Sequence, residues 1–161
     1  MMNGEGGSAP LPARILAIDF GTKRIGLAVS DALGITAQGL PTLERSNLEH
    51  DLRKIQALVE EYSAERVILG NPLGASGHET AMSQRAAAFA RKLRRRLDCP
   101  VELWDERLTS VEANRVLRES GMGIEKRRRA ADRVAVTLLL QGYLDRRASE
   151  AERNQAGGAG P

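Results

Sequence analysis

The sequence predicts an α/β fold whose core is a five-stranded mixed sheet, with three antiparallel strands, two parallel strands and helices on both faces. Near the start of the chain, three short apolar runs follow one another with only turn residues between them, which is typical of an antiparallel meander. Helical and strand patterns then alternate, as they do where helices connect parallel strands. A chain of 161 residues suits a single domain with a sizeable core.

Five segments have strand character, at about residues 14–20, 24–30, 35–43, 66–70 and 101–104. The first is apolar on both faces apart from Asp19, which predicts a central strand covered on both sides. The second follows after a short turn and pairs with the first as a hairpin. Pro41 lies in the third segment, so that strand is at an edge of the sheet or ends at the proline.

Four helices are expected, over about residues 48–62, 80–97, 110–119 and 126–147. The first and third open with capping-box patterns, Ser46 to Glu49 and Thr109 to Glu112. The last is apolar over much of its circumference, which predicts that it packs deep against the sheet.

The composition predicts one folded unit over residues 14–147, with a disordered leader at 1–13 and a disordered tail at 148–161. No apolar run approaches the roughly 20 residues that span a bilayer, and the first residues lack the pattern of a signal peptide. Cys99 is the single cysteine, so no disulfide can form within the chain. We therefore expect a cytoplasmic protein that does not engage membranes.

Basic residues gather in two clusters, although the net charge is only +3. They are Arg91, Lys92, Arg94, Arg95 and Arg96 in one cluster, and Lys126, Arg127, Arg128, Arg129 and Arg133 in the other. Such clusters can neutralise the phosphates of a nucleic acid, or they can be solvated helix faces. Aromatic residues make up only 3% of the chain, which argues against single-strand binding by base stacking.

Acidic residues stand at the ends of three predicted elements. Asp19 lies in an apolar strand, where a carboxylate is costly to bury unless it is paired or binds a metal, although it could instead cap the following turn. Asp105 and Glu106 directly follow the fifth strand, and Asp132 opens the apolar stripe of the last helix. Each acid also has an ordinary structural explanation: a loop acid, a partner for a nearby arginine, or a favourable charge near a helix N-terminus.

Together the acids form a candidate metal site. Hard divalent cations such as magnesium take oxygen ligands, and two ions about 4 Å apart can activate a water and stabilise the leaving oxygen of a phosphodiester. The glycines of the segment 70–77 would let backbone approach a ligand closely, but the segment lacks the ending of a Walker loop. Lys23 and Arg24, beside Asp19, are candidate phosphate contacts.

Four motifs resemble the YqgF/RuvX family, whose members are described as pre-16S ribosomal RNA nucleases and Holliday junction resolvase-like proteins. They are Ala17 to Gly26 (AIDFGTKRIG), Gly70-Asn71-Pro72-Leu73 with Gly77, Asp105 to Ser110 (DERLTS), and Ala131-Asp132-Arg133 with Gln141 to Leu144. The motifs follow the order and spacing of the family and span nearly the whole predicted unit. Asn71 stands where the family usually has leucine.

The resemblance implies a ribonuclease H-like fold and trimming of the 5′ end of the small-subunit ribosomal RNA precursor. It carries over Asp19, Glu106 and Asp132 as an acidic triad that holds Mg²⁺ or Mn²⁺, with Asp105 as an alternative or additional ligand. The cations expected to contact nucleic acid are Lys23, Arg24, Arg94, Arg95, Arg107, Arg127 and Arg128.

Three alternatives remain open on the sequence. The substrate could be branched DNA, in which case a symmetric dimer making paired cuts is expected, whereas an RNA nuclease could be a monomer or a homodimer. The chain could bind nucleic acid without cleaving it. The segment Asp19 to Thr22 also resembles the first phosphate loop of sugar kinases and actin-like ATPases, but those proteins need two such domains and this chain holds one.

Overall fold

The computed structural model describes residues 13–107 and 124–158, with the side chains of 124–132 and 158 outside the description. The elements follow in the order β1 (Ile15–Phe20), β2 (Arg24–Ser30), β3 (Ala37–Glu44), α1 (Leu48–Glu61), β4 (Arg66–Asn71), α2 (Ala81–Arg96), β5 (Val101–Asp105) and α4 (Ile124–Gly158). The helix expected over 110–119 lies outside the described residues.

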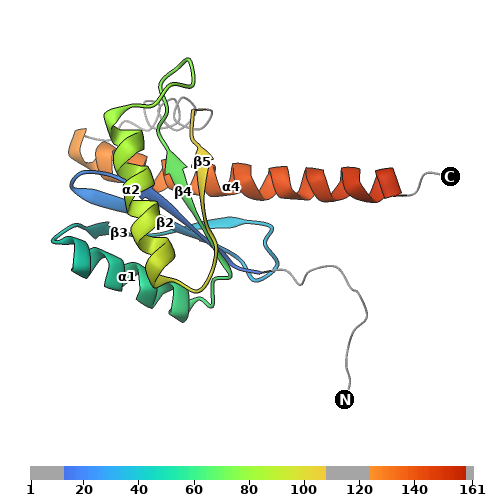
Figure 1. Cartoon of the computed structure of the whole chain (residues 1–161), viewed down its shortest axis with the longest axis horizontal. Helices are drawn as coiled ribbons and strands as arrows, with labels where there is room; N and C mark the ends of the chain where they lie inside the picture. The colour runs from blue at the N-terminus through green and yellow to red at the C-terminus, as the bar shows by residue number, and fades with distance from the viewer. Residues whose placement is uncertain (1–12, 108–123, 159–161) are drawn as a thin grey trace.

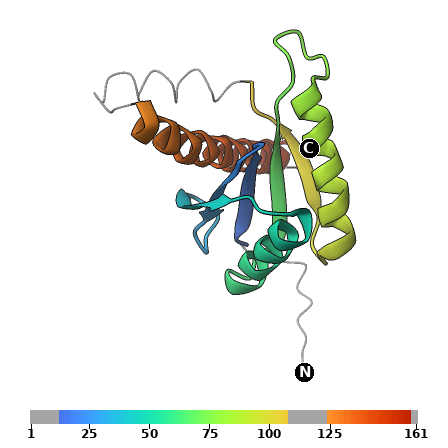
Figure 2. The same cartoon turned by 90° about the vertical axis from the view of Figure 1, so that its left-hand side faces the viewer.

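The sheet has five strands in the order β3-β2-β1-β4-β5. β1 pairs antiparallel with β2 and β2 with β3, whereas β4 pairs parallel with both β1 and β5. Helices α1 and α2 cover one face and α4 crosses the other (Figures 1 and 2). The predicted α/β class, strand number, pairing directions and two-sided cover are therefore confirmed.

Side chains of β1 alternate between the two cores. Leu16, Ile18 and Phe20 belong to the cluster under α1 and α2. Ile15 and Ala17 belong to the cluster under α4. Because neighbouring side chains on a strand point to opposite faces, Asp19 shares the α4 face with Ile15 and Ala17.

Pro41 lies inside the edge strand β3 and does not end it. The pairing with β2 shifts between Ile25 and Leu27, whose partners are Leu43 and Leu40, so β3 carries an extra residue there. A bulge at this point accommodates a residue without an N–H donor, and the strand continues to Glu44.

Asn47, and not Ser46, caps α1: its side chain accepts a hydrogen bond from the backbone N–H of His50 at 2.9 Å. The Ser46 N–H is satisfied by Asp51 at 3.2 Å, and the Glu49 carboxylate pairs with Arg96, so the expected capping box does not form. Helix α2 has a complete box between Thr80 and Ser83.

Helix α4 continues to Gly158, beyond the end expected near residue 147. The prediction of a disordered tail is therefore wrong for 148–158. Alanine, glutamate, arginine and glutamine, which favour helices, dominate this stretch, and Arg146 pairs with Glu150 one turn on at 3.4 Å. The extension projects past the sheet with its side chains exposed (Figure 1). Within the described residues, no helix is long and apolar enough to cross a membrane.

Candidate active site

Two acidic residues meet at the carboxyl ends of β1 and β5, with β4 between those strands. Ala17 of β1 and Ile68 of β4 belong to the core under α4, and Trp104 of β5 packs against it. Two positions further along each strand come Asp19, Gly70 and Glu106. Since side chains two residues apart share a face, these three positions lie together on the side that α4 covers.

Gly70 makes room for the Glu106 carboxylate. A Cβ atom built on Gly70 would collide with Glu106 Oε2 and would stand 3.0 Å from Leu139 Cδ1 of α4. Any side chain at this position would displace Glu106 or push α4 away from the sheet. The absence of a side chain at Gly70 thus leaves space for the Glu106 carboxylate between β4 and α4.

Burial raises the pKa of Glu106 from 4.5 to about 7, and the nearby negative charges of Asp19 and then Asp105 add to the shift. Like charges in a partly shielded site disfavour joint ionisation. A divalent cation beside both carboxylates would remove that repulsion, because a bound cation is the strongest local charge. Asp19 and Glu106 therefore fit a cation that prefers oxygen ligands.

The third predicted ligand, Asp132, lies in α4 one turn before Val136 and two turns before Leu139. Both of those residues are buried against the sheet, so position 132 is on the sheet-facing side of the helix. Its side chain lies outside the described part. Among the side chains that are described, no group of three or more metal-binding residues gathers, so Asp132 stays a prediction as the third ligand.

Asp105 is exposed to solvent and forms an ion pair with Arg107. The guanidinium donates from Nε to both carboxylate oxygens at 3.0 and 2.8 Å, Nη2 lies 2.6 Å from Oδ2, and the Arg107 N–H donates to Oδ1 at 3.0 Å. This ion pair holds the pKa of Asp105 below its usual value. Arg107 also reaches the carbonyl of Ala75 at 3.5 Å, so it tethers the loop after β4 to the end of β5.

The loop after β4 folds on itself. A Cβ at Gly74 would overlap the ring of His78, whose Nδ1 lies 2.7 Å from Ser76 Oγ. Gly77 has a φ of +87°, which favours glycine. Gly70 and Gly74 thus accommodate side chains of the chain itself, and the expected close approach of their backbone to a ligand stays a prediction.

The structure separates the predicted cations into different groups. Lys23 and Arg24 lie in and after the turn that follows β1, near Asp19. Arg94 donates to the carbonyl of Val101 at 2.8 Å, at the start of β5, and Arg95 is its neighbour on α2. Five strand residues, about 17 Å at ~3.3 Å each, separate that point from Glu106. Arg94 and Arg95 therefore lie apart from the acid pair, and their expected contact with nucleic acid stays a prediction. The side chains of Arg127 and Arg128 lie outside the described part.

Arg45 and Asp51 fix the turn beside Asp19, and no feature of the sequence pointed to them. Arg45 donates from Nη1 to the carbonyls of Gly21 and Thr22 at 3.3 and 3.5 Å. Its Nε donates to Asp51 at 3.0 Å, and Asp51 is fully buried. Arg45 lies in the loop between β3 and α1, and Asp51 lies in α1, six residues later. This spacing matches no known sequence motif, so only the fold reveals the pair.

The sequence profile of the RuvX family, described as Holliday junction resolvase, matches residues 13–146. The chain belongs to the RuvX family. Relatives share the name "Putative pre-16S rRNA nuclease". One from Koribacter versatilis is 52% identical over 139 residues, covering 86% of this chain and 91% of the relative. Another, from Moorella thermoacetica, is 47% identical over 133 residues, covering 83% and 95%.

Solved structures show the same fold at low identity to this RuvX-family chain. The RuvC protein of T. thermophilus, in complex with a Holliday junction substrate, aligns with a TM-score of 0.50 and 13% identity over 78% of this chain and 91% of that one. The Fowlpox virus resolvase, in complex with Holliday junction DNA, gives 0.50 and 13% over 82% and 97%. The ribonuclease H-like fold expected from the sequence is confirmed by these likenesses.

Proposed function

We propose that this RuvX-family protein is a metal-dependent nuclease that hydrolyses phosphodiester bonds and processes the 5′ end of pre-16S ribosomal RNA. The observation that carries the proposal is that the Glu106 carboxylate packs against the bare backbone of Gly70, close enough to Asp19 for the two negative charges to repel each other. Its support from relatives is the shared name of proteins that this chain matches over more than nine tenths of their length. We also propose a cytoplasmic location, where the protein would meet such a substrate.

Asp19 and Glu106, with Asp132, would hold the divalent cation, Mg²⁺ or Mn²⁺. When bound, such cations polarise the phosphodiester and lower the pKa of a water that attacks it. The chain positions the two described carboxylates on rigid strand ends, and α4 shields Glu106 from water. We propose that Lys23 and Arg24, in and after the turn that follows β1, contact phosphates next to the bond that is cleaved.

Cleavage of a Holliday junction is the second candidate, because the family profile itself is described as a junction resolvase. Both candidates use the same acids and differ in substrate. A resolvase would present two copies of the site to one junction, as a symmetric dimer.

A parallel cleavage assay tests these proposals. Purified protein is incubated with pre-16S RNA and with four-way DNA junctions, each with Mg²⁺, with Mn²⁺ and with a chelator. We expect RNA cleavage that needs the cation, and a loss of at least about 100-fold for Asp19→Asn with substrate binding retained. Cleavage of junctions alone would favour the resolvase, and binding without any cleavage would leave a non-catalytic module.

A further inference from the structure

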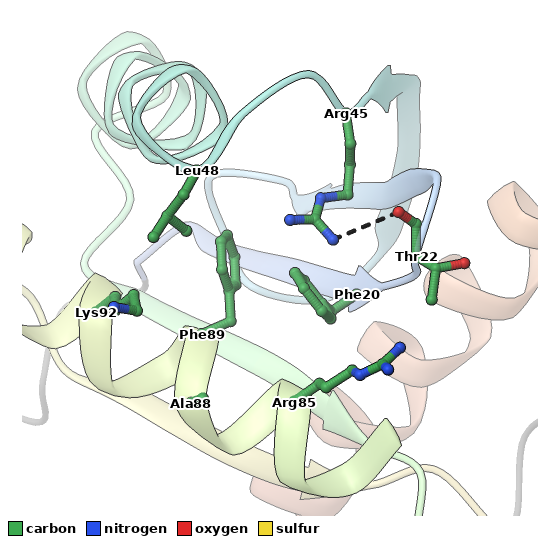
Figure 3. Close-up of a pocket in the computed structure, with 8 residues that line it drawn as sticks. All are labelled: Phe20, Thr22, Arg45, Leu48, Arg85, Ala88, Phe89 and Lys92. Atoms are coloured by element: carbon green, nitrogen blue, oxygen red, sulfur yellow. Dashed lines mark hydrogen bonds between the residues drawn. The ribbon is translucent and has the colours of Figure 1, made fainter. Parts of the chain in front are cut away.

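A cavity of about 350 Å³ opens beside the candidate active site, on the opposite face of the sheet. Its walls come from the end of β1 and the following turn, from the start of α1 and from α2 (Figure 3). Phe20, which follows Asp19 directly, forms part of the wall. Consecutive Cα atoms are about 3.8 Å apart, so the cavity begins within one residue of the acid pair.

The floor of the cavity is apolar. Phe20 and Phe89 are the two phenylalanines of the whole chain, and their ring centroids lie 4.6 Å apart. Leu48, the first residue of α1, and Ala88 of α2 extend this surface (Figure 3). The rings themselves are largely buried, so the floor offers room for one flat apolar group and is not an extended stacking platform.

Cations surround this floor, and no acidic side chain lines the cavity among the described residues. Arg45 is fixed by Asp51, with its guanidinium 4.6 Å from the Phe20 ring centroid. Arg85 and Lys92 stand one above the other on α2, seven residues apart, and neither forms an ion pair with any residue in the described ranges. The unbalanced charge of these two residues favours an anion.

We propose that this cavity binds one nucleotide of single-stranded RNA next to the bond to be cleaved. The base lies against the apolar floor, and a phosphate is neutralised by Arg85 and Lys92. The inference rests on the proposed function, because it takes the occupant from the substrate. A strand that crosses the carboxyl end of β1 can reach both Asp19 on one face and Phe20 on the other.

Charge reversal on one helix tests the assignment. Binding of a fluorescein-labelled hexaadenylate is measured by anisotropy in a chelator, so that neither cation nor cleavage contributes. For Arg85→Glu with Lys92→Glu we expect at least about 10-fold weaker binding and a salt slope that is shallower by about 0.7 for each phosphate that is no longer neutralised. The matched control, Lys54→Glu with Arg153→Glu, makes the same charge change on exposed positions of α1 and α4, away from the cavity, and should weaken binding by no more than about 3-fold.

Ala88→Trp fills the cavity without changing any charge, and thermal melting shows whether it folds. We expect it to weaken hexaadenylate binding as the reversal does. Equal losses in the two double variants, unchanged binding by folded Ala88→Trp, or no binding by the unaltered protein would each overturn the assignment. If the binding difference appears but no substrate is ever cleaved, the cavity assignment stands and the nuclease proposal falls. Cleavage by the unaltered protein together with equal losses would remove the cavity assignment alone.

Discussion

At the scale of single residues, the proposed chemistry depends on how little space surrounds the Glu106 carboxylate. Gly70 lies beneath it, Leu139 of α4 lies beside it, and Asp19 is close enough to raise its pKa. A carboxyl group placed in this way is poorly hydrated and faces a like charge. Such a site is unfavourable for the folded protein until a cation enters, which is typical of functional centres.

Gly70→Ala should damage the site while leaving the fold in place. The added Cβ must displace Glu106 or Leu139, and overpacking of this kind costs about 1–3 kcal/mol. We expect weaker cation binding and slower cleavage, measured together with urea unfolding. Gly142→Ala in α4 is the matched control, because a Cβ there meets nothing within 4 Å, and it should stabilise the helix by about 0.5–1 kcal/mol. Equal effects of the two substitutions would contradict the proposed packing of Glu106 against Gly70.

Glu106 should also make the stability of the cation-free protein depend on pH. Its pKa is about 7 when folded and near 4.5 when unfolded, so the folded state binds the proton more tightly. The stability contributed by the protonated form is complete below pH 4.5 and is lost as the pH rises through 7. Glu106→Gln cannot titrate, so its free energy of unfolding relative to the unaltered protein should rise between pH 4.5 and 7 and then level off. Denaturant unfolding in a chelator measures this difference, and a difference that is constant with pH would contradict the shift.

The sequence allowed a candidate ligand to be recognised where burial of a charged side chain was itself the signal. Asp19 stood out because a carboxylate in an apolar strand requires a partner or a metal. The contact between Glu106 and Gly70 joins residues far apart in the chain, and only the register of β4 with β5 brings them together. The pairing of Asp105 with Arg107, by contrast, joins residues two apart in the chain. Of the two adjacent acids, Asp105 is therefore held in an ion pair, whereas Glu106 faces α4.

At the scale of elements, the limits of β1, β2 and β4 followed closely from the apolar runs, because strands buried on both faces leave little ambiguity. The end of α4 did not, because an exposed helical extension has no apolar stripe to mark its limit. From residue 149 to residue 157 its side chains are exposed. The core contacts of α4 come instead from earlier residues, among them Leu139, Leu140 and Tyr143.

A truncation that ends at Ala148 should therefore fold and cleave like the full chain. Among the described residues the deletion removes one exposed ion pair, Arg146 with Glu150, which is worth little, and we expect a change in unfolding free energy within about 0.5 kcal/mol. Circular dichroism melts and the cleavage assay check this. A truncation before Leu139 removes buried residues and should fail to fold. If the shorter deletion unfolded the protein, the extension would have a structural role that its exposure does not suggest.

At the scale of the whole molecule, the site lies where the antiparallel half of the sheet joins the parallel half. β1 pairs antiparallel with β2 and parallel with β4, so its carboxyl end opens beside the turn that carries Lys23 and beside the loop after β4. Ligands of α/β sheets commonly bind outside the carboxyl ends of parallel strands. The acid pair and the cation-lined cavity flank this edge from opposite faces, which suits a substrate strand that crosses it.

Titration with Mn²⁺, followed by calorimetry and by the electron spin resonance of the free ion, tests the central claim most directly. We predict that the unaltered protein binds the ion, that Asp19→Asn and Glu106→Gln each weaken binding by at least about 10-fold, and that Asp105→Asn leaves it nearly unchanged. Binding that survives both substitutions, or that depends on Asp105 instead, would contradict a cation site between Asp19 and Glu106.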